Sequence, residues 1–521
     1  MKIPLTPLRC LYRAVDLYGR KEAVICGEQR FTYAQFGARC ERFATALENA
    51  GVVYGDRVAF LSFNTHRLLE GYFAAPMARA IVMPLNVRLT PAELETIIHH
   101  AEPRLLFYES DFEAVIPRLC AAHPAMRVVN LNHEFEDFLS TGAPGRRDFM
   151  TYDEDSVAEL FYTSGSTGTP KGVMLSHRTL YLHAITCSTI FGTDDRGVDL
   201  HTIPLFHANG WGRPQAATMF GLKQVMVRRF DPALVCRLIE DEGATAMCVV
   251  PTMANALLNY AGVKAHNYSS LDRILIGGAA ASADLVHKLE AVFGCAVMAG
   301  YGMTETAPVA TSARAKSTVL YKDDADREEH QAMAGWPGIG VEIRVVDPQM
   351  CDVPHDMASI GEVVIRSDNV MEGYYREPEA TAAVMSGSWI HSGDMAVWDE
   401  ETFVHIVDRK KDIIISGGEN VSSIEVENAI AAHPAILEAA VVSAPSKEWG
   451  EIPVAFVVVR PDHTCTQEEL ITYLASRLAR FKTPRIFEFR TEPLPKGGTG
   501  KILKKELREP YWSGMDRRVQ G

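Results

Sequence analysis

Residues 158–173 read AELFYTSGSTGTPKGV, and this stretch predicts a buried strand that leads into an anion-binding loop. The first residues are mostly apolar, as in a strand that is covered on both faces. Glycines at positions 165, 168 and 172 allow several backbone N–H groups to point at one anion. The hydroxyl groups between them add neutral donors, and Lys171 adds a positive charge. The stretch therefore predicts a binding site for a polyphosphate.

The stretch differs from a Walker phosphate loop. A Walker loop has Gly five residues after Gly165, where this chain has Pro170, and Ser or Thr after the lysine, where it has Gly172. A flexible Ser/Gly linker is the alternative interpretation. A linker, however, needs neither a lysine at a fixed position nor a buried strand before it.

Short apolar runs alternate with helix-like stretches along most of the chain, which is typical of α/β folds with parallel sheets. Strands are expected at 57–63, 80–85, 247–251 and 271–278, and helices are expected to begin near Thr90 and Ser282 and to cover 423–433 and 466–481. We expect a large N-terminal domain over residues 1–409, built from two parallel-sheet α/β subdomains and a β-rich subdomain at about 335–407. A small C-terminal α/β domain is expected over residues 410–521.

Size, charge and cysteine spacing exclude several classes of protein. The chain has 521 residues and a formal charge of −14 at pH 7, which argues against a nucleic-acid or anionic-membrane surface as the main partner. None of the ten cysteines forms a Cys-x-x-Cys pair, so zinc-site and disulfide-framework signatures are missing. No stretch is apolar enough for a membrane span or a signal peptide. A cytoplasmic protein is therefore expected.

Four further motifs follow the phosphate loop in order: GGAAAS at 277–282, GYGMTE at 300–305, SGD at 392–394 and LPKGGTGKIL at 494–503. A short motif of this kind is, alone, also compatible with an ordinary turn. In this order they resemble the adenylate-forming superfamily, which includes acyl-CoA synthetases, luciferases and the adenylation domains of peptide synthetases. The resemblance covers essentially the whole chain. Residues 408–430 are especially similar to short- and medium-chain fatty-acyl-CoA ligases, including those that act on methylthiopropionate.

The resemblance implies that ATP and Mg²⁺ bind in the N-terminal domain. Tyr301 would pack on the adenine, Thr304 would contact the α-phosphate, and Glu305 would hold Mg²⁺. This chemistry is suitable, because Mg²⁺ is usually bound by one or two carboxylates together with phosphate oxygens. The other implied ATP- and AMP-binding residues are Thr163, Ser164, Gly165, Ser166, Thr167 (which would also contact the metal), Gly168, Lys171, Gly278, Ala279, Ala280, Gly302 and, at the ribose, Asp394 and Arg409.

The resemblance also implies a mobile C-terminal domain. Lys501 would be catalytic, because its charge would bridge the substrate carboxylate and the α-phosphate. The domain would rotate between two half-reactions about a hinge at Lys411, although local sequence alone favours a solvated charge there. Lys504 and Lys505 are expected on a solvated helix face. After rotation, the coenzyme A tunnel would be lined by Ser416, Gly417, Gly418 and Glu419.

Residues 204–211, PLFHANGW, match the part of the family sequence that borders the acyl substrate. His207 would act at the junction of the acyl pocket and the thiol channel, although a structural histidine is the alternative. The segment has no acid to pair with an amino group, which disfavours an amino-acid substrate. The implied acyl pocket consists of Trp211, Ala299, Gly300, Pro308 and Val309.

We therefore expect an acyl-CoA synthetase that uses ATP, Mg²⁺ and coenzyme A. A short- or medium-chain fatty acid or a methylthiopropionate-like acid is the expected substrate, because a tryptophan in the pocket suits short chains. No carrier-protein domain follows Lys501, so free coenzyme A is the expected acceptor. The alternatives are an aryl-acid CoA ligase, an adenylating enzyme that loads a separate carrier protein or oxidises its adenylate, and a noncatalytic nucleotide-binding protein, which the presence of Lys501 and Glu305 disfavours. A homodimer is left open.

Overall fold

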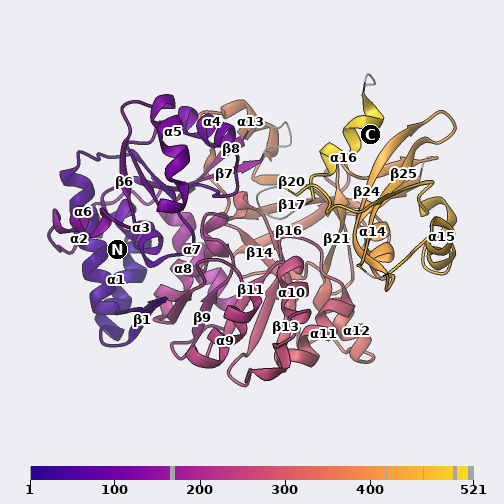
Figure 1. The fold of residues 1–521 in the computed structure, drawn as a ribbon, viewed down its shortest axis with the longest axis horizontal. Helices are drawn as coiled ribbons and strands as arrows, with labels where there is room; N and C mark the ends of the chain where they lie inside the picture. The colour runs from indigo at the N-terminus through magenta and orange to yellow at the C-terminus, as the bar shows by residue number, and fades with distance from the viewer. Residues whose placement is uncertain (1, 165–169, 418, 462, 497–501, 514–521) are drawn as a thin grey trace. The chain divides into compact units, whose positions relative to one another are not determined.

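The computed structural model describes residues 2–164, 170–417, 419–461, 463–496 and 502–513 (Figure 1). The chain forms two compact units. The first contains Met1–Glu342 and Ile365–Ile390, and the second contains Ile343–Val364 and His391–Gly521. Among the described residues, every helix is too short or too polar to span a bilayer.

One sheet of the first unit has seven strands, in the order β18-β8-β7-β4-β3-β5-β6. Neighbours from β7 to β6 are parallel, whereas β8 is antiparallel to both β7 and β18. The strands are β3 (Arg57–Leu61), β4 (Ile81–Pro84), β5 (Leu105–Tyr108), β6 (Arg127–Asn130), β7 (Val157–Ser164), β8 (Pro170–Ser176) and β18 (Gly373–Tyr374). The strand predicted before the phosphate loop is therefore confirmed as β7, and the residues after the loop form a second strand that returns beside it.

The other sheet of the first unit has nine strands, in the order β15-β14-β13-β12-β11-β9-β10-β1-β2. Neighbours from β13 to β1 are parallel, and β2, β14 and β15 run antiparallel to theirs. The strands are β1 (Glu22–Cys26), β2 (Gln29–Thr32), β9 (Val198–His201), β10 (Lys223–Met226), β11 (Ala246–Val249), β12 (Arg273–Ile276), β13 (Ala296–Gly302), β14 (Val309–Ser312) and β15 (Trp336–Pro337). Two largely parallel sheets confirm the predicted α/β class.

Thirteen helices are found among the described residues of the first unit, and two of them begin where the sequence predicted. Thr90 and Glu93 form a capping box at the start of α4, and the Ser282 side chain accepts a hydrogen bond from the Leu285 N–H at the start of α11. α7 and α8 lie side by side (Figure 1). The helices are α1 (Pro7–Tyr18), α2 (Tyr33–Asn49), α3 (His66–Met77), α4 (Pro91–Ala101), α5 (Ile116–Ala122), α6 (Phe135–Ser140), α7 (His177–Ile190), α8 (Ala208–Phe220), α9 (Pro232–Glu242), α10 (Pro251–Leu258), α11 (Ala283–Phe293), α12 (Asp324–Ala332) and α13 (Pro378–Val384).

α8 is buried from residue 210 to residue 219 and is bonded to both sheets of the first unit. Arg213 donates to Asp199 on β9, in the nine-stranded sheet, at 3.0 Å. Gln215 donates to Glu159 on β7, in the seven-stranded sheet, at 2.6 Å. The helix is therefore fixed on two sides by buried polar contacts.

The second unit contains a five-stranded sheet of β22 (Ile414–Ser416), β23 (Glu419–Val421), β24 (Ile436–Ser446), β25 (Gly450–Val459) and β26 (Ile486–Arg490). Alternate residues of β24 face opposite sides, because side chains alternate along a strand. Val441 packs in a core with α14 (Ser423–Ala431) and α15 (Gln467–Ala475), whereas Val442 packs in a core with Leu507 of α16 (Lys504–Trp512). This is the small C-terminal α/β structure predicted from the sequence.

The chain from 341 to 409 supplies five further strands, in agreement with the predicted β-rich segment: β16 (Val341–Val346), β17 (Gly361–Ser367), β19 (Met385–Ser386), β20 (Trp389–Trp398) and β21 (Val404–Arg409). Within the second unit, β20 and β21 pair antiparallel. The helix predicted over 466–481 is shorter than expected, since α15 ends at Ala475 and residues 480–482 form a 3-10 turn.

Candidate active site

The predicted phosphate-binding stretch spans the loop end of the antiparallel β7–β8 hairpin. Thr163 lies opposite Lys171, and Ser164 lies opposite Pro170, at the last two pairs of the ladder. Both strands therefore bring their polar ends to the same tip. The predicted binding residues Gly165, Ser166, Thr167 and Gly168 lie outside the described residues.

Tyr374 lies between Lys171 of this hairpin and Glu305. The Lys171 ammonium is 4.8 Å from the centre of the Tyr374 ring, a cation–π contact. The Tyr374 hydroxyl donates to Glu305 Oε1 at 2.8 Å. Burial and the adjacent Glu305 carboxylate raise the pKa of Tyr374, so its hydroxyl stays protonated near pH 7 and remains a donor. One neutral side chain thus contacts both the predicted phosphate ligand and the predicted metal ligand.

Tyr374 was not predicted as a site residue, and the backbone around it explains its position. β18 pairs with β8, so that Tyr374 lies opposite Val173. The Met371 N–H donates to the Glu305 carbonyl at 2.8 Å, and the Tyr375 N–H donates to the Gly172 carbonyl at 2.7 Å. This segment therefore joins the phosphate hairpin to the turn that carries Glu305.

Thr304 and Glu305 form a 3-10 turn directly after β13, which carries Tyr301 and Gly302. Thr304 is buried, whereas the Glu305 side chain is partly accessible. Among the described residues there is no group of three or more His, Cys, Asp or Glu side chains that would hold a metal ion. A single carboxylate that is oriented by Tyr374 fits Mg²⁺, since this ion takes part of its ligands from phosphates and water.

The turn after β12 carries the predicted adenine-side residues. Gly278 has φ +76°, a conformation that favours glycine, and Gly278, Ala279 and Ala280 are exposed. β12 and β13 are neighbouring parallel strands, so this turn and the Tyr301 region lie at the same edge of the nine-stranded sheet. Ligands of open α/β sheets bind at this carboxyl edge.

Trp211 lies against the two glycines that follow β12. A Cβ atom at position 277 would be 3.0 Å from Trp211 Cη2 and 3.2 Å from the Gly300 carbonyl oxygen, and one at position 278 would be 3.6 Å from Trp211 Cζ2. Ala299 pairs with Ile276, the last residue of β12. The structure therefore brings Trp211, Ala299 and Gly300 together around Gly277.

Pro308 lies against Gly302, and Val309 is linked to the Trp211 segment through His183. Val309 pairs with Gly302, and its N–H donates to His183 Nε2 at 3.1 Å. The His183 ring also lies against Gly212, where a Cβ atom would be 2.2 Å from it. Burial lowers the pKa of His183 to about 3, so the ring is a neutral acceptor. His183 thereby connects Val309 to the residue after Trp211.

His207 is the residue before α8 and is half-buried. Its N–H donates to the Pro204 carbonyl at 3.0 Å, and its carbonyl accepts from the Gly210 N–H at 3.2 Å. Asn64 fixes the loop before it, since the Asn64 side chain donates to the Ile203 carbonyl at 2.9 Å and accepts from the Leu205 N–H at 2.7 Å. His207 and Trp211 are therefore presented by one tightly bonded segment.

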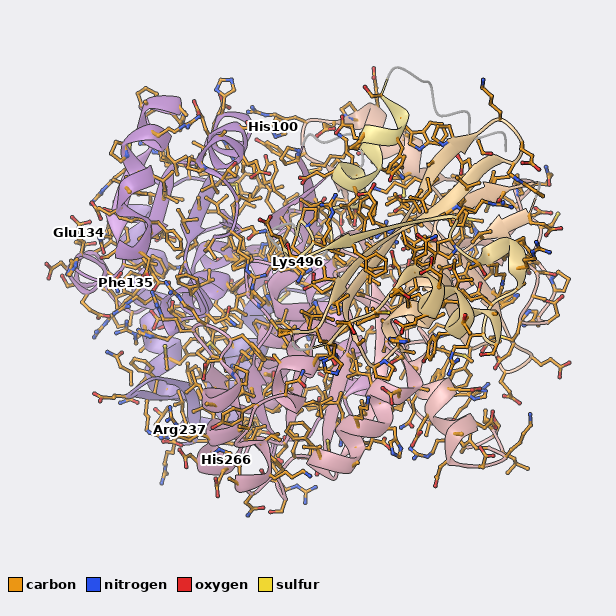
Figure 2. The ribbon with its side chains drawn as sticks, turned by 45° about the vertical axis from the view of Figure 1, so that its right-hand side comes forward. His100, Glu134, Phe135, Arg237, His266 and Lys496 are labelled. Carbon is orange, nitrogen blue, oxygen red and sulfur yellow. The ribbon has the colours of Figure 1, made fainter. Side chains whose placement is uncertain are left out.

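Another histidine, His100 of α4 (labelled in Figure 2), contacts Tyr162 of β7, the strand that leads to the loop. His100 Nδ1 is 2.7 Å from the Tyr162 hydroxyl, and the two rings meet edge to face. Burial lowers the pKa of His100. This contact fixes Tyr162, which pairs with Gly172 next to the Thr163–Lys171 pair.

Asp394 and Arg409, the predicted ribose residues, belong to the second unit and lie opposite each other on β20 and β21. Arg409 Nε is 2.6 Å from Asp394 Oδ1, and the Asp394 side chain is 5% exposed. The Ser392 hydroxyl accepts from the Asp394 N–H at 3.1 Å and donates to the Val363 carbonyl. The SGD motif is therefore part of a strand, and an isolated turn is excluded.

The segment after Arg409 carries the predicted hinge and tunnel residues. Arg508 of α16 donates to the Lys411 carbonyl at 3.3 Å and to Asp412 Oδ1 at 2.8 Å. Ser416 ends β22, Glu419 begins β23, and Gly418 lies outside the described residues. Gly417 has φ +63°, which favours glycine, and a Cβ atom there would be 2.7 Å from the Trp449 ring. Backbone conformation and packing therefore explain this glycine without a bound ligand.

Lys501 lies outside the described residues, but both ends of its loop are described. Lys496 and Ile502 form an antiparallel bridge, and the Leu503 N–H donates to the Pro495 carbonyl at 2.8 Å. Lys496 is bonded to Glu438, so its ammonium is held at the base of the loop (Figure 2).

The prediction that Lys504 lies on a solvated helix face is wrong. Its side chain is 18% exposed, its ammonium is 2.7 Å from Glu427 Oε1, and it donates to the Ser423 hydroxyl at 2.6 Å. Lys504 thus joins α16 to α14. Lys505 is exposed, as predicted.

A model of the family described as AMP-binding enzyme matches residues 11–375, and a model of the AMP-binding enzyme C-terminal domain matches residues 425–501. The chain belongs to the AMP-binding enzyme family. This confirms its predicted place in the adenylate-forming superfamily.

Similar proteins place this AMP-binding enzyme among the CoA ligases. It is 37% identical to a long-chain-fatty-acid–CoA ligase of Thermus thermophilus, over 96% of this chain and 94% of the relative. It is 34% identical to 2-methylpropanoate–CoA ligase CCL4 of Humulus lupulus, over 97% and 95%. The crystal structure of ATP-bound MatB from Rhodopseudomonas palustris matches with a TM-score of 0.87 at 28% identity, over 98% and 99%. The protein is an AMP-forming acyl-CoA ligase, an acid–thiol ligase.

Proposed function

We propose that this ligase activates a short- or medium-chain fatty acid, or a methylthiopropionate-like acid, with ATP and transfers the acyl group to coenzyme A. The observation that carries the proposal is the indole of Trp211, which packs on Gly277 and Gly278. A large rigid side chain at that point shortens the space left for an acyl chain. The named substrates of the two relatives above differ in chain length, so the choice depends on the pocket of this chain.

The first half-reaction joins the acid to AMP. A carboxylate oxygen attacks the α-phosphorus of ATP, the bond to the β-phosphate oxygen breaks, and pyrophosphate leaves. Positioning and charge neutralisation are the protein's main tasks in such a step. Lys171 and Thr163 would bind the phosphates, Glu305 would hold Mg²⁺, and Lys501 would neutralise the two anions that approach each other. The bound ion would supply charge neutralisation on the phosphate oxygens.

The second half-reaction needs the coenzyme A sulfur at the acyl carbon. The thiolate attacks the carbonyl carbon, and AMP leaves with the former carboxylate oxygen. We place the hinge for this change of state at Lys411, with Ser416, Gly417, Gly418 and Glu419 beside the thiol path and His207 at its inner end. Lys411→Pro tests the hinge: adenylate formation should persist, whereas thioester formation should fall. Wild-type rates of both half-reactions in this variant would refute the assignment.

Pyrophosphate release with a panel of carboxylic acids, each with and without coenzyme A, tests the proposed function. Butyrate, octanoate, methylthiopropionate, dodecanoate and benzoate cover the substrate classes. We expect the highest kcat/KM with butyrate to octanoate or methylthiopropionate, and acyl-CoA only when coenzyme A is present. A preference for benzoate would favour the aryl-acid alternative. Pyrophosphate release that coenzyme A does not alter would favour a carrier-loading enzyme.

The compartment and the oligomeric state remain part of the proposal. We place the enzyme in the cytoplasm, which cell fractionation with an antibody tests directly. We infer no contact for a homodimer, and analytical ultracentrifugation distinguishes a monomer from a dimer.

A further inference from the structure

The first turn of α8 has an unusual backbone. Ala208, Gly210, Trp211 and Gly212 have φ values of 42°, 56°, 66° and 74°. The left-handed conformation suits glycine, but for a residue with a side chain it costs about 1–2 kcal/mol. Such conformations persist only where the surroundings hold them. Something therefore holds Trp211 in place.

Arg213, two residues after Trp211, anchors the turn to the nine-stranded sheet. Its Nε is 3.0 Å from Asp199 Oδ2, and the two side chains are 3% and 2% exposed. Its guanidinium lies 4.0 Å from the centre of the Phe191 ring. An ion pair that is this deeply buried is costly to separate, because each charge has lost its water. The position of Arg213 is therefore fixed relative to β9.

Cys187 of α7 extends this anchor to the main chain of Trp211. The Cys187 thiol donates to the Trp211 carbonyl at 3.6 Å and accepts from Arg213 Nη1 at 3.8 Å. On the other side, the His183 ring lies against Gly212 and leaves no room for a side chain there. Contacts on both sides thus hold the left-handed turn.

The Asp199 carboxylate has a further neighbour, His201, whose ring also contacts Gln224. His201 Nε2 is 3.6 Å from Asp199 Oδ2 and 3.1 Å from Gln224 Oε1. Burial lowers the pKa of His201, so its ring is neutral near pH 7 and Arg213 is the cation that faces Asp199. Gln224 in turn donates to Thr218 of α8 at 3.1 Å, which ties the same helix to the sheet at a second point.

We propose that the Asp199–Arg213 ion pair is a positioning element that sets the length of the acyl chain this ligase accepts, acting through Trp211. The inference rests on the acyl-pocket role proposed for Trp211. The pair holds the left-handed turn, the turn holds the indole on Gly277 and Gly278, and the indole limits the pocket. Without the pair, the turn is free to adopt a right-handed helical conformation that moves the indole off the glycines.

The test is the chain-length profile of the double variant Asp199→Leu/Arg213→Met. It removes both charges together, because a single substitution would leave a buried charge without a partner. We expect the ratio of kcat/KM for dodecanoate to that for butyrate to rise about tenfold, a typical effect of small changes in an apolar pocket. The KM for ATP should stay at the wild-type value, which a general loss of structure would not produce.

Two control variants make the result decisive. Arg39→Met/Glu70→Leu removes another ion pair of the same unit, between the buried Glu70 and the partly buried Arg39, which also pairs with Glu136. The Nε and Oε1 atoms of this pair are 2.6 Å apart, and it joins α2 to α3. Its chain-length profile should match the wild type. Trp211→Gly opens the pocket directly and should shift the profile toward dodecanoate. A shift in Trp211→Gly but not in the folded double variant would overturn the inference and leave the proposed function intact. No shift in either would remove Trp211 from the acyl pocket.

If the double variant does not fold, Cys187→Ala supplies the same readout, because it removes the thiol between Arg213 and Trp211. A rise in the dodecanoate-to-butyrate ratio would support the inference, and an unchanged ratio would contradict it. Wild-type protein that forms no acyl-CoA from any acid of the panel would refute the proposed function, and the inference with it.

Discussion

Replacing Tyr374 by phenylalanine removes one oxygen atom and leaves the ring beneath the Lys171 ammonium. The lost hydroxyl donates to Glu305 Oε1 at 2.8 Å, so the variant frees the carboxylate that is proposed to hold Mg²⁺. The cation–π contact of Lys171 at 4.8 Å should persist, because it involves only the ring. The substitution therefore isolates the orientation of Glu305.

The magnitude follows from the type of bond. A hydrogen bond to a charged group contributes about 1.5–3 kcal/mol, and about 1.4 kcal/mol corresponds to a factor of ten. We therefore expect kcat/KM for ATP to fall by about 10- to 100-fold in Tyr374→Phe. The concentration of Mg²⁺ required for half-maximal rate should rise, whereas the profile over carboxylic acids should stay the same.

Initial rates of pyrophosphate release at varied ATP and Mg²⁺ measure this effect. Tyr375→Phe is the matched control: it is the same chemical change one residue later, where the ring packs on His100 at 5.7 Å. The control should retain wild-type kinetics. If Tyr374→Phe kept the wild-type kcat/KM for ATP and the wild-type Mg²⁺ dependence, the proposed orientation of Glu305 by Tyr374 would be refuted.

Three further predictions concern other parts of the chain. Lys501→Ala should lower the rate of acyl-adenylate formation by at least about 100-fold, while thioester formation from supplied acyl-AMP persists. The control Lys496→Ala, which removes the ammonium bound to Glu438, should keep both rates. Equal loss of both half-reactions in Lys501→Ala would contradict the role of Lys501. Lys504→Met leaves Glu427 without its cation and should lower the stability of the second unit by about 3 kcal/mol in thermal unfolding. The control Lys505→Met should change this stability little. Similar melting curves for the two variants would contradict a stabilising role of the Lys504–Glu427 ion pair. His183 has a folded-state pKa of about 3, below the value of about 6.5 in the unfolded chain, so its contribution is complete above pH 6.5 and is lost as the pH falls. Between pH 6 and pH 4 the wild type should therefore lose about 2.5 kcal/mol more stability than His183→Asn. Denaturant titrations measure the free energy of unfolding of both proteins at each pH. If the two free energies changed in parallel with pH, His183 would be protonated in the folded protein as readily as in the unfolded chain.

Regular elements of this fold could be predicted where the sequence contains a local signal. Runs such as RILI at 273–276 predicted a strand because apolar β-branched residues suit a strand that is buried on both faces. Thr90 and Ser282 predicted helix starts because their side chains can accept from the first free N–H groups. Both signals depend only on residues a few positions apart.

Contacts between distant segments could not be predicted in the same way. Tyr374 meets Glu305 only because β18 adds to the edge of β8, an antiparallel pairing that no local pattern in PKGVMLS indicates. Lys504 is buried only because Glu427 and Ser423 face it from α14, far away in the sequence. Arg213 did leave a signal, since a single charged residue in the apolar segment 208–220 suggests a buried partner.

The fate of the carboxylate oxygens tests the central claim most directly. An acyl-adenylate intermediate requires that the acid attacks the α-phosphorus and that the thiol then breaks the bond between the acyl carbon and the bridging oxygen. With butyrate labelled with oxygen-18 in both carboxylate positions, one labelled oxygen should appear in AMP, one should stay in the acyl-CoA, and pyrophosphate should carry none. Label in pyrophosphate or inorganic phosphate, or AMP that carries no label while acyl-CoA accumulates, would contradict an acyl-adenylate intermediate.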